Sequence, residues 1–140
     1  MTSTEPPPGR MEPPVTPTSE PFWEATKQRQ LVLQWCTECE RAIFFPRDNC
    51  PVCLGSSLDW RPASGRGVVH SVTVETSSPN PAIAGGDPYA VALVDLEEGV
   101  RMMSNIVGCP PGEVAVGQAV QVTWAQLSDG RHLPQFERRE

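Results

Sequence analysis

The sequence predicts a mainly β protein in which a short N-terminal helix and a small four-cysteine ribbon precede a five-stranded barrel. Two Cys-x-x-Cys pairs lie close together in the first half of the chain. Five segments with partial period-two alternation of apolar residues follow them. No convincing helical pattern separates these five segments, which is typical of a small antiparallel barrel of the OB type.

The N-terminal residues are too polar and too rich in proline to build a core. Seven of the 16 prolines fall within the first 21 residues, and such a composition does not offset the entropy of ordering. We therefore assign residues 1–19 to a disordered tail, which is either an inert spacer or a linker to another domain. Residues 20–63 form the helix and ribbon, and residues 64–140 form the barrel.

Each element has its own local signal. Ser19 is expected to cap a short helix that enters through Glu20 and Pro21 and ends near Gln30. Apolar and β-branched runs predict ribbon strands at 31–35, 41–46 and 58–60, and barrel strands at 68–76, 89–96, 100–107, 120–124 and near 133–137. The Pro/Gly/Ser-rich segment 77–88 is a long loop, and such loops are often functional.

The cysteine spacing predicts a metal site. Cys36, Cys39, Cys50 and Cys53 form a C-x2-C-x10-C-x2-C pattern, in which two tight turns aim four sulfurs at one ion. Four thiolates leave no open position, so we expect one structural Zn²⁺; a redox dithiol or an iron site is the alternative. Because no export signal is visible, we expect the reducing cytoplasm, where paired cysteines bind metals rather than form disulfides. Cys109 reads as a half-buried thiol.

The sequence offers no credible catalytic set and little sign of other binding classes. His70 lies mid-strand and is expected in the core, whereas His132 lies near a turn and is expected in solvent. The net charge of −6, without a dense basic stripe, argues against a nucleic-acid binder. No apolar run is long enough to span a membrane.

Several blocks together resemble a known family. They are Pro21-Phe22-Trp23, the four-cysteine ribbon, 67–74, 88–96, 99–108, Val116-Gly117 and 133–136. This combination is similar to the acyl-CoA-associated family with a rubredoxin-like zinc ribbon and an OB-fold, formerly a domain of unknown function. The segment 128–134 and the proline-rich tail look like the branch fused behind a steroid enoyl-CoA hydratase domain.

The resemblance implies a partner subunit that has no activity alone. In that branch the domain accompanies a thiolase-like aldolase of the lipid-transfer-protein type, in an expected heterotetramer that cleaves a steroid side-chain acyl-CoA during cholesterol catabolism. One alternative is a channelling subunit of a thiolase or hydroxymethylglutaryl-CoA synthase complex. A nucleic-acid-binding zinc-ribbon protein and an independent hydrolase or lyase are further alternatives.

Within this reading, two sets of residues are candidates for contacts. Phe22 and Trp23 are expected to anchor the partner, because buried aromatic side chains dominate such interfaces; packing on the chain's own ribbon or barrel is the alternative. Arg41, Arg47 and Arg66 are expected to pair with CoA phosphates, since guanidinium groups match phosphate geometry. Solvated charge, or shielding of an anionic metal site, is the alternative for these arginines.

Overall fold

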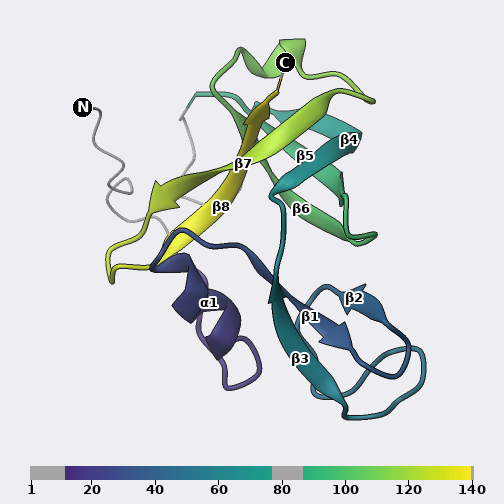
Figure 1. Cartoon of the computed structure of the whole chain (residues 1–140). Coiled ribbons are helices and arrows are strands. Elements are labelled where there is room, and N and C mark those ends of the chain that lie inside the picture. Colours follow the sequence, from purple (N-terminus) through teal and green to yellow (C-terminus); the bar gives the residue numbers. More distant parts are fainter. Residues whose placement is uncertain (1–11, 77–86, 140) are drawn as a thin grey trace.

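The computed structural model describes residues 12–76 and 87–139 as a three-stranded sheet and a helix at one end of a closed barrel (Figure 1). The helix α1 spans Glu20–Thr26. The small sheet has the antiparallel order β2-β1-β3 and forms the ribbon, with β1 at Val32–Cys36, β2 at Arg41–Ile43 and β3 at Leu58–Pro62. This architecture confirms the predicted mainly β fold.

Five strands close the barrel in the order β4-β5-β6-β8-β7. The first three are β4 (Arg66–Glu75), β5 (Tyr89–Leu96) and β6 (Arg101–Val107); the 3-10 helix η1 (Pro111–Glu113) separates them from β7 (Ala119–Gln126) and β8 (His132–Arg138). Neighbours are antiparallel except β6 and β8, which pair in parallel through Ile106–Phe136 and Val107–Glu137. Residues 77–86 of the predicted loop and residues 1–11 of the predicted tail lie outside the described residues.

One apolar core joins the two halves of the fold. Phe22 of α1, with Leu31 and Leu33 before and within β1, belongs to the same buried cluster as the barrel residues Val94 and Phe136. A second, much smaller cluster lies inside the ribbon and contains Cys36, Ile43 and Cys50. The ribbon is therefore packed onto the barrel along β1 but has little apolar material of its own.

The helix begins at Glu20 after Ser19, as the sequence predicted, but it is shorter than expected and lacks the expected cap. It ends at Thr26 because Arg29 takes a left-handed conformation, with φ of 55°, and the N–H of Gln30 donates back to the carbonyl of Ala25 at 3.1 Å. This is the Schellman arrangement. Ser19 makes no side-chain cap; its Oγ accepts hydrogen bonds from Thr16 instead. In the described part of the chain, no helix is long and apolar enough to cross a membrane.

Gly67 is the tightest glycine position between barrel strands and yields a stability prediction. A Cβ on Gly67 would lie 2.5 Å from the backbone oxygen of Asp95 and 2.8 Å from Cγ1 of Val94. Gly67→Ala forces β4 away from β5, so urea unfolding should show a loss of about 1–3 kcal/mol. Gly112→Ala is the matched control, since its Cβ meets nothing within 4 Å. Equal losses in the two variants would contradict this account.

Candidate functional site

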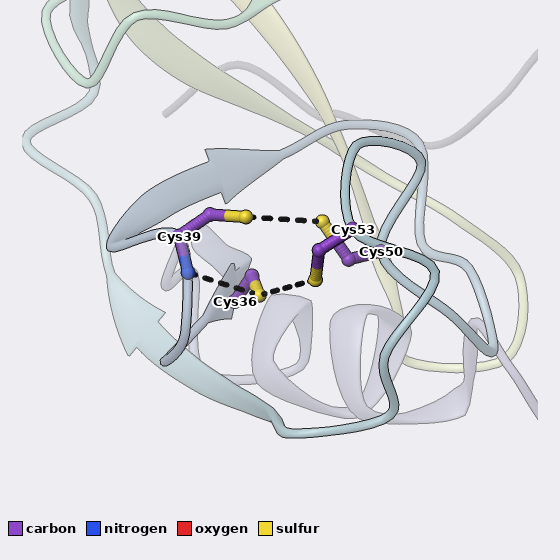
Figure 2. A group of neighbouring side chains, drawn as sticks. All are labelled: Cys36, Cys39, Cys50 and Cys53. Atoms are coloured by element: carbon purple, nitrogen blue, oxygen red, sulfur yellow. Dashed lines mark hydrogen bonds between the residues drawn. The ribbon is translucent and has the colours of Figure 1, made fainter.

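The four predicted metal ligands meet at one end of the ribbon (Figure 2). Cys36 ends β1 and Cys39 lies in the turn that follows, while Cys50 and Cys53 lie in the turn before β3. All four Sγ atoms lie within 4.8 Å of one another; Cys36 and Cys53 are 3.6 Å apart, and Cys39 and Cys50 are 3.9 Å apart. A tetrahedral ion with metal–sulfur bonds of about 2.3 Å requires sulfur separations of about 3.8 Å. The cluster therefore fits a four-coordinate metal.

The turns around the cysteines are shaped to hold the sulfurs inward. The N–H groups of Cys39 and Val52 point at the sulfurs of Cys36 and Cys50, each at 3.4 Å. Glu40 and Leu54 follow the second cysteine of each pair with φ values of 53° and 63°. This left-handed conformation usually favours glycine. The chain accepts this strain at both turns, which indicates that the sulfur positions are closely specified.

Two of the four neighbouring thiols have pKa values shifted in opposite directions. A hydrogen bond from the backbone N–H of Cys53 is the main cause that lowers the pKa of Cys50 to about 6. A hydrogen bond with the Cys53 side chain is the main cause that raises the pKa of Cys39 to about 12. Sulfurs this close cannot all carry a negative charge unless a cation balances them. Binding of a divalent ion supplies that charge, because metal ligation displaces the thiol protons.

Two of the three predicted phosphate-binding arginines line one open cleft of about 380 Å³ between the ribbon and the β5–β6 turn. They are Arg41 and Arg47, and among the described residues neither has an acidic group within ion-pair distance. Arg66 is not part of this lining and lies 3.8 Å from Glu97. The structure instead adds Arg101, which the sequence analysis missed because it lies on β6, far along the chain.

Arg101 belongs to a surface cluster that also contains His70. Its guanidinium lies 2.6 Å from the Asp95 carboxylate, and a hydrogen bond from it is the main cause that lowers the pKa of Asp95. The prediction that His70 packs in the core is wrong. His70 is the residue at a β-bulge between Val69 and Ser71. Its ring is exposed, and its Nδ1 lies 3.4 Å from the Asp95 carboxylate. Alternation turns Val69 inward and His70 outward.

His132 is buried, so the prediction that it lies in solvent is also wrong. Only 9% of it is exposed. Its Nδ1 lies 2.8 Å from the carbonyl oxygen of Thr26, which can only accept, so this nitrogen carries the proton. The backbone N–H of His132 also donates to the Thr26 hydroxyl. These bonds fix the end of α1 to the start of β8 and leave His132 without a catalytic geometry.

An apolar groove of about 280 Å³ runs between α1, the ribbon and the barrel. Its walls include Trp23, Phe44, Phe45, Met103 and Leu133. Phe45 and Met103 are 67% and 69% exposed. Phe22 also borders the groove but is only 6% exposed and packs edge-on against Trp23. Burial of Phe22 agrees with the alternative that it packs on its own chain, and Trp23, which is partly buried, also packs against this core but still lines the groove.

A four-thiol ribbon followed by a closed five-stranded barrel defines the class as ribbon–OB proteins. Two family models match in that order: the ChsH2 rubredoxin-like zinc ribbon domain over residues 23–59, and the ChsH2 C-terminal OB-fold domain over residues 60–125. A solved structure, the Ltp2-ChsH2(DUF35) aldolase, matches with a TM-score of 0.80 and 35% identity, over 91% of this chain and 98% of that one. The chain therefore belongs to the DUF35 family.

Curated relatives carry two kinds of name. A probable enoyl-CoA hydratase alpha subunit of Thermomonospora curvata is 40% identical over 116 residues, which are 82% of this chain but 36% of that protein. The 3-oxo-4,17-pregnadiene-20-carboxyl-CoA hydratase alpha subunit of Mycobacterium tuberculosis is 38% identical over 73 residues, which are 51% of this chain and 22% of that protein. A DUF35 domain-containing scaffold protein of Methanothermobacter thermautotrophicus is 33% identical over 109 residues, 76% of this chain and 81% of that one.

The metal centre generates a direct prediction. Cys50→Ser removes a ligand, so the purified variant should lose its bound ion and melt at a much lower temperature, because structural metal binding contributes to folding free energy. Elemental analysis and thermal unfolding measure the two effects. Cys109→Ser is the matched control: Cys109 packs against the barrel core, as its predicted half-burial requires, and lies outside the cluster. Unchanged metal content in Cys50→Ser would refute the assignment.

Proposed function

We propose that this chain is a non-catalytic accessory subunit that binds and activates a thiolase-like aldolase. The single observation that carries the proposal is its match over 98% of the ChsH2(DUF35) chain of a named aldolase complex. The steroid hydratase relative supports a steroid side-chain acyl-CoA as the substrate. The scaffold name of the archaeal relative supports a role without chemistry of its own. We place this complex, as a heterotetramer, in the cytoplasm, where thiols stay reduced.

The proposed chemistry assigns every proton transfer to the partner. Retro-aldol cleavage of a β-hydroxy acyl thioester needs a base for the hydroxyl proton, an acid for the departing enolate, and stabilisation of its charge. Among the described residues, Nδ1 of His132 is committed to the Thr26 carbonyl, and the His70 ring contacts Asp95 and Arg101 at the surface. We assign this chain the tasks of stabilising the partner's fold and completing the substrate entrance.

The metal in this proposal is one structural Zn²⁺ per chain. Four cysteine ligands with the observed sulfur spacing suit zinc, and a four-thiolate shell leaves no coordination position for water or substrate. Zinc, when bound, supplies folding free energy to a ribbon whose own cluster of buried residues is small. Cys36, Cys39, Cys50 and Cys53 would hold it.

The cleft that contains Arg41 and Arg47 is the proposed contact for the phosphates of CoA. Arg41 and Arg47, which have no acidic ion-pair partner among the described residues, line one open space together with Arg101, whose guanidinium is paired with Asp95. Phosphate groups accept bidentate hydrogen bonds from such side chains. Arg66 is the weaker candidate because Glu97 lies beside it and it is not among the residues that line the cleft.

The apolar groove is the proposed surface for the aldolase. Trp23 lines it, and the exposed side chains of Phe45 and Met103 give it the character of an interface anchor. Phe22 supports Trp23 from below rather than reaching a partner itself. Residues 77–86, the other contact expected from the sequence, lie outside the described residues.

Reconstitution tests the proposed activity. We expect the aldolase subunit and this chain each to show almost no cleavage of a steroid side-chain acyl-CoA alone, and the mixture to release the shortened steroid ketone. Chromatography of the products measures this release, and size-exclusion analysis measures assembly. Full activity of the aldolase without this chain, or turnover by this chain alone, would overturn the proposal.

The groove has a matched test. Phe45→Ala and Met103→Ala should each weaken assembly with the aldolase by about five- to thirtyfold, since losing a buried anchor typically costs about 1–2 kcal/mol. Val116→Ala is the control, because Val116 is equally exposed at 67% but lies outside the groove lining. Calorimetric titration measures the dissociation constants. Similar affinities for all three variants would place the interface elsewhere.

A further inference from the structure

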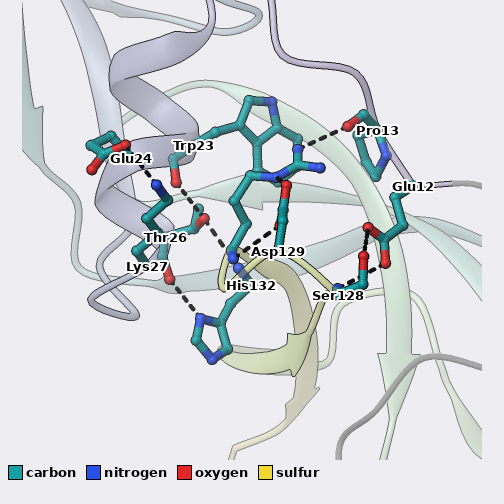
Figure 3. A network of polar contacts seen from close by, with 10 residues as sticks. Glu12, Pro13, Trp23, Glu24, Thr26, Lys27, Ser128, Asp129 and His132 are labelled. Atoms are coloured by element: carbon teal, nitrogen blue, oxygen red, sulfur yellow. Dashed lines mark hydrogen bonds and ion pairs between the residues drawn. The ribbon is translucent and has the colours of Figure 1, made fainter.

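The segment before α1 is held on the barrel by a polar site in the β7–β8 turn (Figure 3). The two carboxylate oxygens of Glu12 accept hydrogen bonds from the backbone N–H of Ser128 at 2.9 Å and from its hydroxyl at 2.7 Å. The carbonyl of Pro13 accepts one from Nη1 of Arg131 at 2.8 Å. Residues of the β7–β8 turn therefore form hydrogen bonds with two consecutive residues of this segment, Glu12 and Pro13.

Contacts with Asp129 and Trp23, independent of the segment before α1, hold the Arg131 side chain in place. Its side chain is 7% exposed, its Nε donates to the Asp129 carboxylate at 2.7 Å, and its guanidinium carbon lies 4.9 Å from the centre of the Trp23 ring. A buried guanidinium is costly unless its donors are used. Asp129 and Trp23 orient the group, and the peptide carbonyl satisfies a further donor. Arg131 thus has the features of a binding-site residue rather than a solvated surface charge.

The remaining contacts suit proline. Pro13 and Pro14 lie along the same groove wall as Trp23, and proline keeps a segment extended at low entropic cost, which is the basis of polyproline recognition by aromatic surfaces. Ser128, which donates to the carboxylate, Arg131, which donates to the carbonyl, and the wall that contains Trp23 together fit the sequence Glu-Pro-Pro. This tripeptide occurs twice in the chain, at residues 5–7 and again at residues 12–14.

We propose that Ser128, Arg131 and Trp23 form a recognition site for an extended Glu-Pro-Pro peptide, and that the chain offers this site two copies of its ligand. Residues 12–14 fill the site in the structure. Exchange for residues 5–7 would add seven residues between the site and α1, which can span at most about 25 Å. That slack would release Pro13 and Pro14 from the groove wall and uncover Trp23. The copy that occupies the site thus sets the length of chain between the site and α1.

Hydrogen exchange of the Ser128 amide in the full-length chain tests the proposal. The double variant Glu5→Gln/Glu12→Gln should exchange this amide about tenfold faster than the unchanged chain, because charge-assisted hydrogen bonds worth about 1.5 kcal/mol are lost. Glu5→Gln alone is the matched control and should not change the rate. Glu12→Gln alone should give an intermediate rate, because residues 5–7 replace the weakened copy.

Each other result counts against the proposal. An unchanged exchange rate of the Ser128 amide in the double variant would refute the recognition site. An exchange rate in Glu12→Gln equal to that of the double variant would refute binding of the second copy, residues 5–7. A synthetic peptide of residues 11–15, added to the double variant, should restore slow exchange and shift the indole N–H resonance of Trp23. Arg131→Lys should abolish this rescue, whereas Arg138→Lys, whose arginine pairs with Glu113, should retain it. Rescue that survives Arg131→Lys would exclude Arg131 from recognition.

Discussion

The burial of Phe22, Leu31 and Leu33 in the same core as the barrel strands is the constraint on which the other features depend. The buried cluster inside the ribbon is too small to fix the orientation of the ribbon. Packing of β1 against the barrel core fixes that orientation instead. The arginine-lined cleft forms where the ribbon faces the β5–β6 turn, and the apolar groove forms where ribbon, helix and barrel meet. Both surfaces lie at boundaries between the ribbon and the barrel, and both would lose their shape if this packing failed.

The metal cluster and the arginine cleft share one stretch of chain. Arg41 and Arg47 lie between the two cysteine pairs; Arg41 begins β2, and the side chain of Gln34 on β1 holds the backbone of Arg47. A divalent ion bound by four thiolates carries a net charge of about −2, which nearby arginines partly offset. The cysteine cluster and the arginine-lined cleft thus share the segment between the two cysteine pairs.

Features set by local sequence were predictable, and features set by distant partners were not. The Cys-x-x-Cys spacing and the strand alternation carry their structure within a few residues, so the ribbon and the barrel strands followed from them. His70 and His132 were placed on the wrong sides of the surface. Strand alternation turns His70 outward beside a register shift, and a bond to Thr26, 106 residues away, holds His132 inside. The contact of Glu12 with Ser128 joins residues 116 apart, and no composition rule signals it.

The bonds between Thr26 and His132 also order events during folding. A seven-residue helix is too short to persist alone, since nucleation costs more than so few hydrogen bonds return. Its end is fixed by β8, and closing a loop of 106 residues is slow unless other contacts have already shortened it. The barrel strands must therefore assemble first and provide the template on which α1 forms. The first regular element along the described chain is the last to become stable.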